Sequence, residues 1–184
     1  MNRFSAVIVG LSILAVGCGD SSSPSAPSQG TTTTSTFTVP LSPANEVPAI
    51  ANADASGSGT ATIALTVTRD DSGTIASATA NFQISVAGFP AGTSVTDAHI
   101  HNGSAGSNAG IYVSAGLAAG ELALTNGSGS VAKNGINVPA DRAAAILSNP
   151  AGHYFNVHTA LNPAGAIRGQ LGGAVVNPGT GVSY

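Results

Sequence analysis

The chain has 184 residues, of which 7% are charged and 42% hydrophobic, and its formal net charge is −3 at pH 7. Soluble domains typically have about a quarter of their residues charged, so hydroxyl and amide groups must supply most of the polar surface here. The five Lys and Arg residues are too few for a basic, phosphate-binding surface, so we expect no nucleic-acid partner.

Residues 1–17 resemble the signal peptide of a bacterial lipoprotein. A positively charged start precedes an apolar run from Phe4 to Val16, which is too short to remain as a membrane-spanning anchor. Gly17 then precedes the single cysteine of the chain, Cys18, whose thiol would carry the lipid after cleavage. Gly19 follows where an acidic residue would favour the inner membrane, so we expect an exported protein, lipid-anchored in the bacterial cell envelope at the outer membrane or cell surface. The alternative is an ordinary secretory signal with an incidental cysteine.

Residues 18–36 are rich in Ser, Thr and Pro and predict a flexible tether. The eighteen residues after Cys18, 19–36, reach about 20–25 Å as a flexible coil, which is enough to hold a domain clear of lipid headgroups. We expect the folded domain to occupy residues 37–173 and a flexible tail to occupy residues 174–184.

The domain has the alternating apolar and polar pattern of strands that are half-buried on one face. Residues 59–86 predict a hairpin, because Ile63, Leu65 and Val67 share one parity and "RDDSG" at 69–73 is a turn sequence. Only "PADRAAAILSNP" at 139–150 predicts a helix, with proline at its start. The further strands are expected in residues 36–41, 94–101, 111–117, 129–138, 153–160 and 165–171. Many short strands with turns between them predict an all-β, Greek-key-like sandwich or barrel with one short helix.

Three of the four histidines are placed by strand periodicity on polar faces. Residues two apart in a strand point the same way, so His99 and His101 share a face. In "HYFNVHT", Phe155 and Val157 suit the core, which leaves His158 on the polar face with Tyr154 and Asn156. If the two strands pair or face each other, three imidazoles converge, and such a set suits a mononuclear Cu or Zn site.

An alternative interpretation of the same histidines needs no metal. Buried imidazoles often form a polar cluster, in which they bond to carbonyls, to Asn156, to Asp97 or to one another and hold loops in place. Glu46 and Arg168 suggest a separate structural ion pair, since either charge needs a partner if it is buried.

Four stretches, in this order, resemble the CHRD domain: "LSPANEVPA" at 41–49, "AHIHNGSAGSNAGI" at 98–111, "HYFNVHT" at 153–159 and "GAIRGQL" at 165–171. Two positions depart from the usual pattern, namely Ala49, where the family often has a second proline, and Ala166, where it often has an acid. The resemblance implies an all-β extracytoplasmic domain and carries no agreed biochemical activity.

We therefore expect a lipid-anchored CHRD domain that acts as a binding or assembly module without catalysis. Its partner is a protein, a glycan or a second copy, besides the membrane that the lipid on Cys18 would contact. The sequence has no serine-nucleophile elbow, phosphate loop or HExxH motif. The alternative is a mononuclear Cu or Zn protein that uses His99, His101 and His158. A redox enzyme that acts through this metal is the extension of that alternative. A His-x-His strand on a β-sandwich is similar to copper–zinc superoxide dismutase, but four histidines are too few for that dinuclear site.

Overall fold

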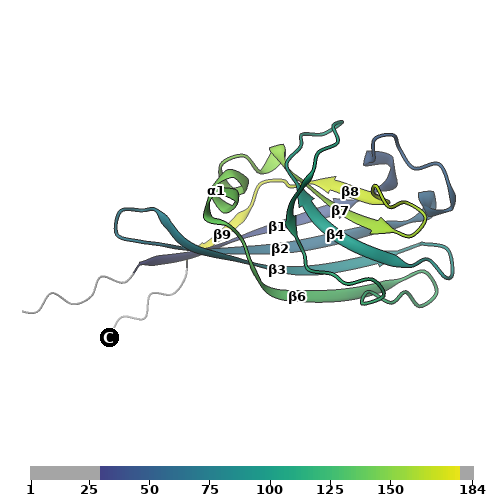
Figure 1. Cartoon of the computed structure of the whole chain (residues 1–184), viewed down its shortest axis with the longest axis horizontal. Coiled ribbons are helices and arrows are strands. Elements are labelled where there is room, and N and C mark those ends of the chain that lie inside the picture. Colours follow the sequence, from purple (N-terminus) through teal and green to yellow (C-terminus); the bar gives the residue numbers. More distant parts are fainter. Residues whose placement is uncertain (1–29, 179–184) are drawn as a thin grey trace, which may run out of the picture.

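Two antiparallel β-sheets stack on each other in the computed structural model, which describes residues 30–178 (Figure 1). The large sheet has the strand order β6-β3-β2-β1-β9, and the small sheet has the order β5-β4-β7-β8. The strands are β1 (Thr31–Leu41), β2 (Ser58–Arg69), β3 (Ile75–Ala87), β4 (Val95–His101), β5 (Ile111–Ser114), β6 (Gly129–Asn137), β7 (Tyr154–Thr159), β8 (Ile167–Gln170) and β9 (Val175–Pro178). The predicted all-β sandwich is confirmed.

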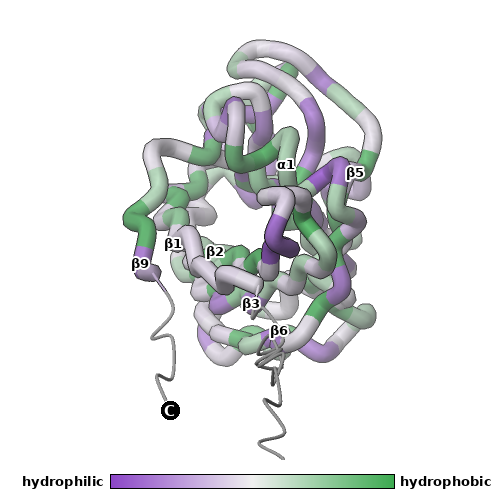
Figure 2. The backbone as a smooth tube through the Cα atoms, turned by 90° about the vertical axis from the view of Figure 1, so that its left-hand side faces the viewer, coloured by the Kyte–Doolittle hydropathy of each residue, from purple (hydrophilic) through white to green (hydrophobic). Residues whose placement is uncertain are grey.

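Alternating side chains from both sheets fill the space between them. On β2, Ile63, Leu65 and Val67 are buried in the core, as their shared parity predicted. Thr62, Thr66 and Thr68 have the other parity and are only half-buried. Phe82 of β3 and Phe155 of β7 stack across the sandwich with ring centroids 5.8 Å apart. Figure 2 shows the hydrophobic and hydrophilic positions alternating along the chain instead of separating into long blocks. Burial of the apolar set is the main force that holds the two sheets together.

The helix α1 (Ala140–Ser148) follows Pro139, close to the predicted span of 139–150. It packs Ala143 and Ile146 into the core. Three short 3₁₀ helices lie at Pro43–Asn45, Ala53–Ser56 and Pro150–Gly152. Within residues 30–178, no helix has both the length and the hydropathy needed to cross a membrane.

The expected tether and tail boundaries are wrong. Strand β1 begins at Thr31, so residues 31–36 belong to the sheet and not to a tether. Strand β9 lies in the expected tail and pairs with Thr33–Thr36 of β1. Threonine is a β-branched residue that favours strands, and its hydroxyls also bond across β1 and β2, with Thr34 Oγ1 2.8 Å from Thr66 Oγ1. Tether residues 18–29, which include Cys18, tail residues 179–184 and the signal peptide lie outside the described residues.

The two sheets meet along one edge, where β1 ends beside β8. The backbone groups of Ser42 and Arg168 exchange two hydrogen bonds of 3.1 and 3.2 Å. Gly169 is required at this junction, because a Cβ there would collide with the carbonyl oxygen of Pro40. The chain then passes from Ser42 over the outer face of the small sheet, where the histidines lie.

Candidate metal centre

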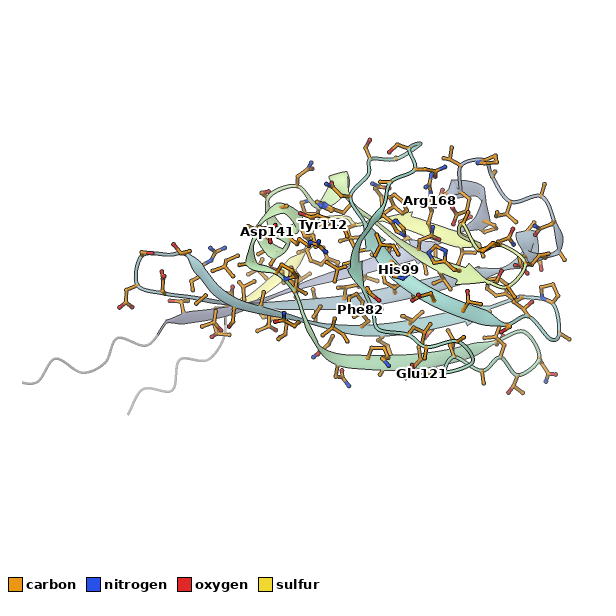
Figure 3. The ribbon with its side chains drawn as sticks, in the orientation of Figure 1. Phe82, His99, Tyr112, Glu121, Asp141 and Arg168 are labelled. Carbon is orange, nitrogen blue, oxygen red and sulfur yellow. The ribbon has the colours of Figure 1, made fainter. Side chains whose placement is uncertain are left out.

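The histidines lie on the face of the small sheet that points away from the core. Strands β4 and β7 are antiparallel neighbours, and Asp97 is directly opposite His158. In the same ladder His99 is opposite Asn156, and His101 is opposite Tyr154. The three histidines are nevertheless between 5% and 7% exposed, because loops cover this face. Figure 3 shows His99 and Arg168 on the small-sheet side, away from Glu121.

The three imidazoles converge on one point. One ring nitrogen from each of His99, His101 and His158 lies within 4.8 Å of the other two. The shortest separation, His99 Nδ1 to His158 Nε2, is 3.2 Å. Two imidazole nitrogens bound to one tetrahedral zinc are roughly 3.3 Å apart, given the usual zinc–nitrogen distance. The closest pair is therefore already at the separation that a shared metal ion requires.

The outer nitrogen of each ring faces a hydrogen-bond acceptor. His99 Nε2 is 3.0 Å from Asp97 Oδ2, and His101 Nδ1 is 2.9 Å from the carbonyl oxygen of Ala109. His158 Nδ1 is 3.1 Å from the carbonyl oxygen of Pro163. If each outer nitrogen carries the hydrogen of a neutral ring, the three inner nitrogens all present lone pairs. Carboxylates and carbonyls hold metal-bound histidines in this way.

With an ionised Asp97 and neutral rings, the close contacts of the cluster have one hydrogen too few. Three close contacts join Asp97, His99, His158 and Pro163 in a row. They are Asp97 to His99, His99 to His158, and His158 to the carbonyl oxygen of Pro163. Each contact needs one hydrogen, and two neutral imidazoles supply only two. A third proton or a metal ion would fill the remaining contact. His101 Nε2 is also buried and has no hydrogen-bond partner.

Burial makes the third proton unfavourable. Desolvation is the largest influence on the pKa of His99, His101 and His158, and it lowers all three. The charge of Asp97 raises the pKa of His99 and of His158, but only partly offsets burial. The rings are therefore held neutral near pH 7, which is the form that binds metals.

Arg168 holds the loops that cover this face. Its Nε donates to the carbonyl oxygen of Asn45 at 2.6 Å, and its Nη1 donates to Ser107 O and Asn108 Oδ1, both at 3.0 Å. The guanidinium also lies over the Tyr154 ring, 4.6 Å from its centroid. Tyr154 in turn stacks on His101, with ring centroids 4.7 Å apart. Loss of Arg168 would therefore release both loops and the ring that supports His101.

The suggested Glu46–Arg168 pair is a close approach of two buried groups. Glu46 Oε2 is 3.8 Å from Arg168 Nε, which is longer than a hydrogen bond. Burial raises the pKa of Glu46 to about 7, against the opposing effects of the Arg168 charge and the neighbouring Asn156. Glu46 Oε1, Asn156 Oδ1 and Arg168 Nη2 are buried without hydrogen-bond partners.

Of the two residues expected to support the histidines, Asp97 contacts one of them and Asn156 forms no hydrogen bond with any of the three. Asp97 contacts His99 directly. The hydrogen bonds of the three histidines within residues 30–178 go to other groups than Asn156. Asn156 instead lies against Gly165, where a Cβ would collide with its amide. Strand parity placed Asn156 on the correct face of β7, but parity could not show that its neighbour there is Gly165.

A second buried network was missed by sequence reasoning. Asp54 is almost fully buried, and its Oδ2 accepts hydrogen bonds from Thr159 Oγ1 at 2.6 Å and Asn162 Nδ2 at 2.7 Å. This network ties the segment before β2 to the turn that contains Pro163. The only signal in the sequence is one acidic residue in "NADAS", which is also typical of an exposed turn.

Comparison with known proteins identifies the domain. No curated protein and no solved structure matches the chain significantly. The sequence profile of the CHRD domain matches residues 37–171, which is most of the chain and contains every residue of the candidate metal centre. Membership of this family suggests a role as a binding module. The chain belongs to the CHRD domain family.

Proposed function

We propose that this CHRD domain binds one copper or zinc ion through His99, His101 and His158. The supporting observation is the arrangement of hydrogen-bond acceptors around the rings. Each outer nitrogen faces an acceptor, and all three inner nitrogens face one another without enough protons to fill the space. Three imidazoles suit copper or zinc and leave a coordination position open.

Asp97 has a defined part in this proposal. A carboxylate that accepts a hydrogen bond from a ligating histidine fixes the ring and makes its other nitrogen a stronger base. Asp97 Oδ1 also accepts a hydrogen bond from the Ala98 backbone nitrogen at 2.8 Å, so the carboxylate is itself oriented. Replacement of Asp97 by asparagine is expected to weaken metal binding about 10–100-fold without removing a ligand.

The test is metal retention by the exported chain, residues 18–184 with Cys18→Ser. Metal-free protein is incubated separately with Cu²⁺ and Zn²⁺, desalted, and analysed for its metal content. We expect close to one equivalent in the unchanged site, and loss of that metal in His101→Gln. His153→Gln is the matched control. His153 is buried and directly precedes β7, the strand of His158, but its Nδ1 bonds to Asn149 O outside the cluster. No retained metal, or equal retention in His101→Gln, would overturn the proposal.

We also propose that the protein is exported and lipid-anchored through Cys18. This rests on the sequence of residues 1–18, where an apolar run and a small residue precede the cysteine. The expected result is that the full chain partitions into the detergent phase of bacterial envelope extracts, and that Cys18→Ser is released in soluble form. Identical partitioning of both proteins would contradict lipidation.

Self-association is a second candidate function, favoured by the edge strand β9. Val175 and Val176 are 68% and 59% exposed on this strand, whose outer edge has no strand partner among the described residues. Exposed apolar edge strands are templates for pairing with another chain. Light scattering coupled to size exclusion is expected to show a dimer that Val176→Lys converts to a monomer. A concentration-independent monomer would exclude this candidate.

A further inference from the structure

A cleft of about 750 Å³ opens beside the histidines. It lies between residues 46–52, the loop at 108–109 and the turn at 161–165, and both His101 and Tyr154 line it. Ala109 and Pro163, whose carbonyl oxygens hold His101 and His158, are also part of its wall. The cleft is therefore adjacent to the proposed metal centre.

Most polar groups of the cleft are used to hold its loops together. Asn52 Nδ2 donates to Asn162 Oδ1 at 2.7 Å, and Asn108 Nδ2 donates to the carbonyl oxygen of Val47 at 2.7 Å. Two lining side chains are left with buried, unpartnered polar atoms, namely Oε1 of Glu46 and Nε2 of His101. The Glu46 oxygen faces the cleft wall at Gly165, where a Cβ would lie 2.9 Å from it.

The rest of the wall is apolar. Val47 and Leu161 are large hydrophobic residues that remain exposed at the surface, and Pro48, Ile50 and Pro163 continue the same lining. An apolar wall with few unpartnered polar groups is the usual form of a small-molecule site. Such a wall suits a ligand with an apolar body, and the two free polar atoms define its head group.

We infer that the cleft binds a small organic molecule with a hydroxyl head group and an apolar body. This inference rests on the proposed metal site, because the metal would occupy His101 Nε2 and take the hydroxyl oxygen at its open position. The hydroxyl hydrogen is then donated to Glu46 Oε1. The apolar body lies against Val47 and Leu161, and water is displaced from both.

The test uses phenol as the probe and anisole as its matched control, since anisole has the same ring but no hydroxyl hydrogen. Both are titrated into the copper-loaded exported chain with Cys18→Ser, and the copper absorption and electron paramagnetic resonance spectra are recorded. We expect phenol to change the spectra saturably. Anisole should bind at least about tenfold more weakly, because it cannot donate to the carboxyl group.

Variants at exposed alanines assign the binding to the cleft. Ala164→Trp places a large side chain in the cleft wall and is expected to weaken phenol binding more than about tenfold with unchanged copper content. Ala144→Trp, at an exposed position of α1 outside the cleft, should bind phenol as the parent does. Retained copper without a phenol response, equal affinity for anisole, or unchanged binding by Ala164→Trp would overturn the inference alone. Failure to retain copper would overturn it together with the proposed function.

Discussion

The parent protein is expected to lose stability as the pH rises, because Glu46 becomes ionised. Replacement of Glu46 by glutamine should abolish this pH dependence. Burial raises the pKa of Glu46 from its ordinary value of 4.5 to about 7, so the folded protein retains a proton that the unfolded chain has lost. The stability contributed by the neutral carboxyl group is complete below about pH 4.5 and is lost as the pH rises through about 7. Over this interval, at 1.36 kcal/mol per pH unit, the loss amounts to about 3 kcal/mol.

The assay is urea unfolding of the metal-free exported chain and its Glu46→Gln variant between about pH 5 and about pH 8, the range in which the carboxyl group titrates. Glutamine resembles the protonated carboxyl group in shape and charge, so the variant should lack this pH dependence. The histidines are common to both proteins, and the difference in unfolding free energy therefore isolates Glu46. We expect the parent to lose about 2.5 kcal/mol relative to the variant across the range.

A constant difference between the two proteins at every pH would refute this reasoning. Glu46 would then be ionised throughout, and attraction to Arg168 would outweigh burial. The separation of 3.8 Å between Glu46 Oε2 and Arg168 Nε leaves the pair without a direct hydrogen bond. This distance therefore argues for the expected pH-dependent difference and against a constant one.

Three further predictions concern the histidines and the turn that covers them. Zinc at a hundredfold excess over its Kd should raise the unfolding free energy of the parent by about 2.7 kcal/mol in urea titrations, and His158→Gln should show no increase. Because burial lowers the pKa of His99, His101 and His158, the metal-free protein should lose stability as pH falls from about 6.5 towards these lower values. Thermal melts of Glu46→Gln should show this loss, and a flat profile would contradict neutral, buried imidazoles. Gly165→Ala should destabilise the domain by about 2–4 kcal/mol, because φ is +135° and the new Cβ would strike the Asn156 amide. An unfolding free energy within about 0.5 kcal/mol of the parent would show that the turn adjusts freely.

Strand periodicity was enough to place the three histidines on the correct faces. Alternation is a property of the backbone, so it assigned His99 and His101 to one face and His158 to the face opposite Phe155. It could not show that β4 and β7 are neighbours, because their pairing joins segments more than 50 residues apart in the sequence. Periodicity also could not predict the acceptors at Ala109 and Pro163, because they are backbone carbonyl groups in loops and any residue supplies a carbonyl.

The errors at the ends of the domain have one physical origin. Thr33–Thr36 of β1 and Val175–Pro178 are paired with each other, although the first segment reads as a low-complexity tether and the second as a loose tail. Neither segment carries enough apolar residues to indicate a strand by itself. The hydrogen-bonded partner that completes each one is at the other end of the chain, and composition measured over a short window does not contain it.

The buried charged side chains are connected to the cleft beside the three histidines, either directly or through a residue that lines it. Among residues 30–178, the buried Asp, Glu, Lys and Arg side chains are Glu46, Asp54 and Arg168. Glu46 lines the cleft, Asp54 holds the turn before Pro163, and Arg168 supports the ring stacked on His101. Burying a charge is costly, and apolar residues of similar volume often stabilise a protein as well or better. In a chain with only 7% charged residues, the connection of all three groups to one cleft supports the metal site and the ligand site proposed above.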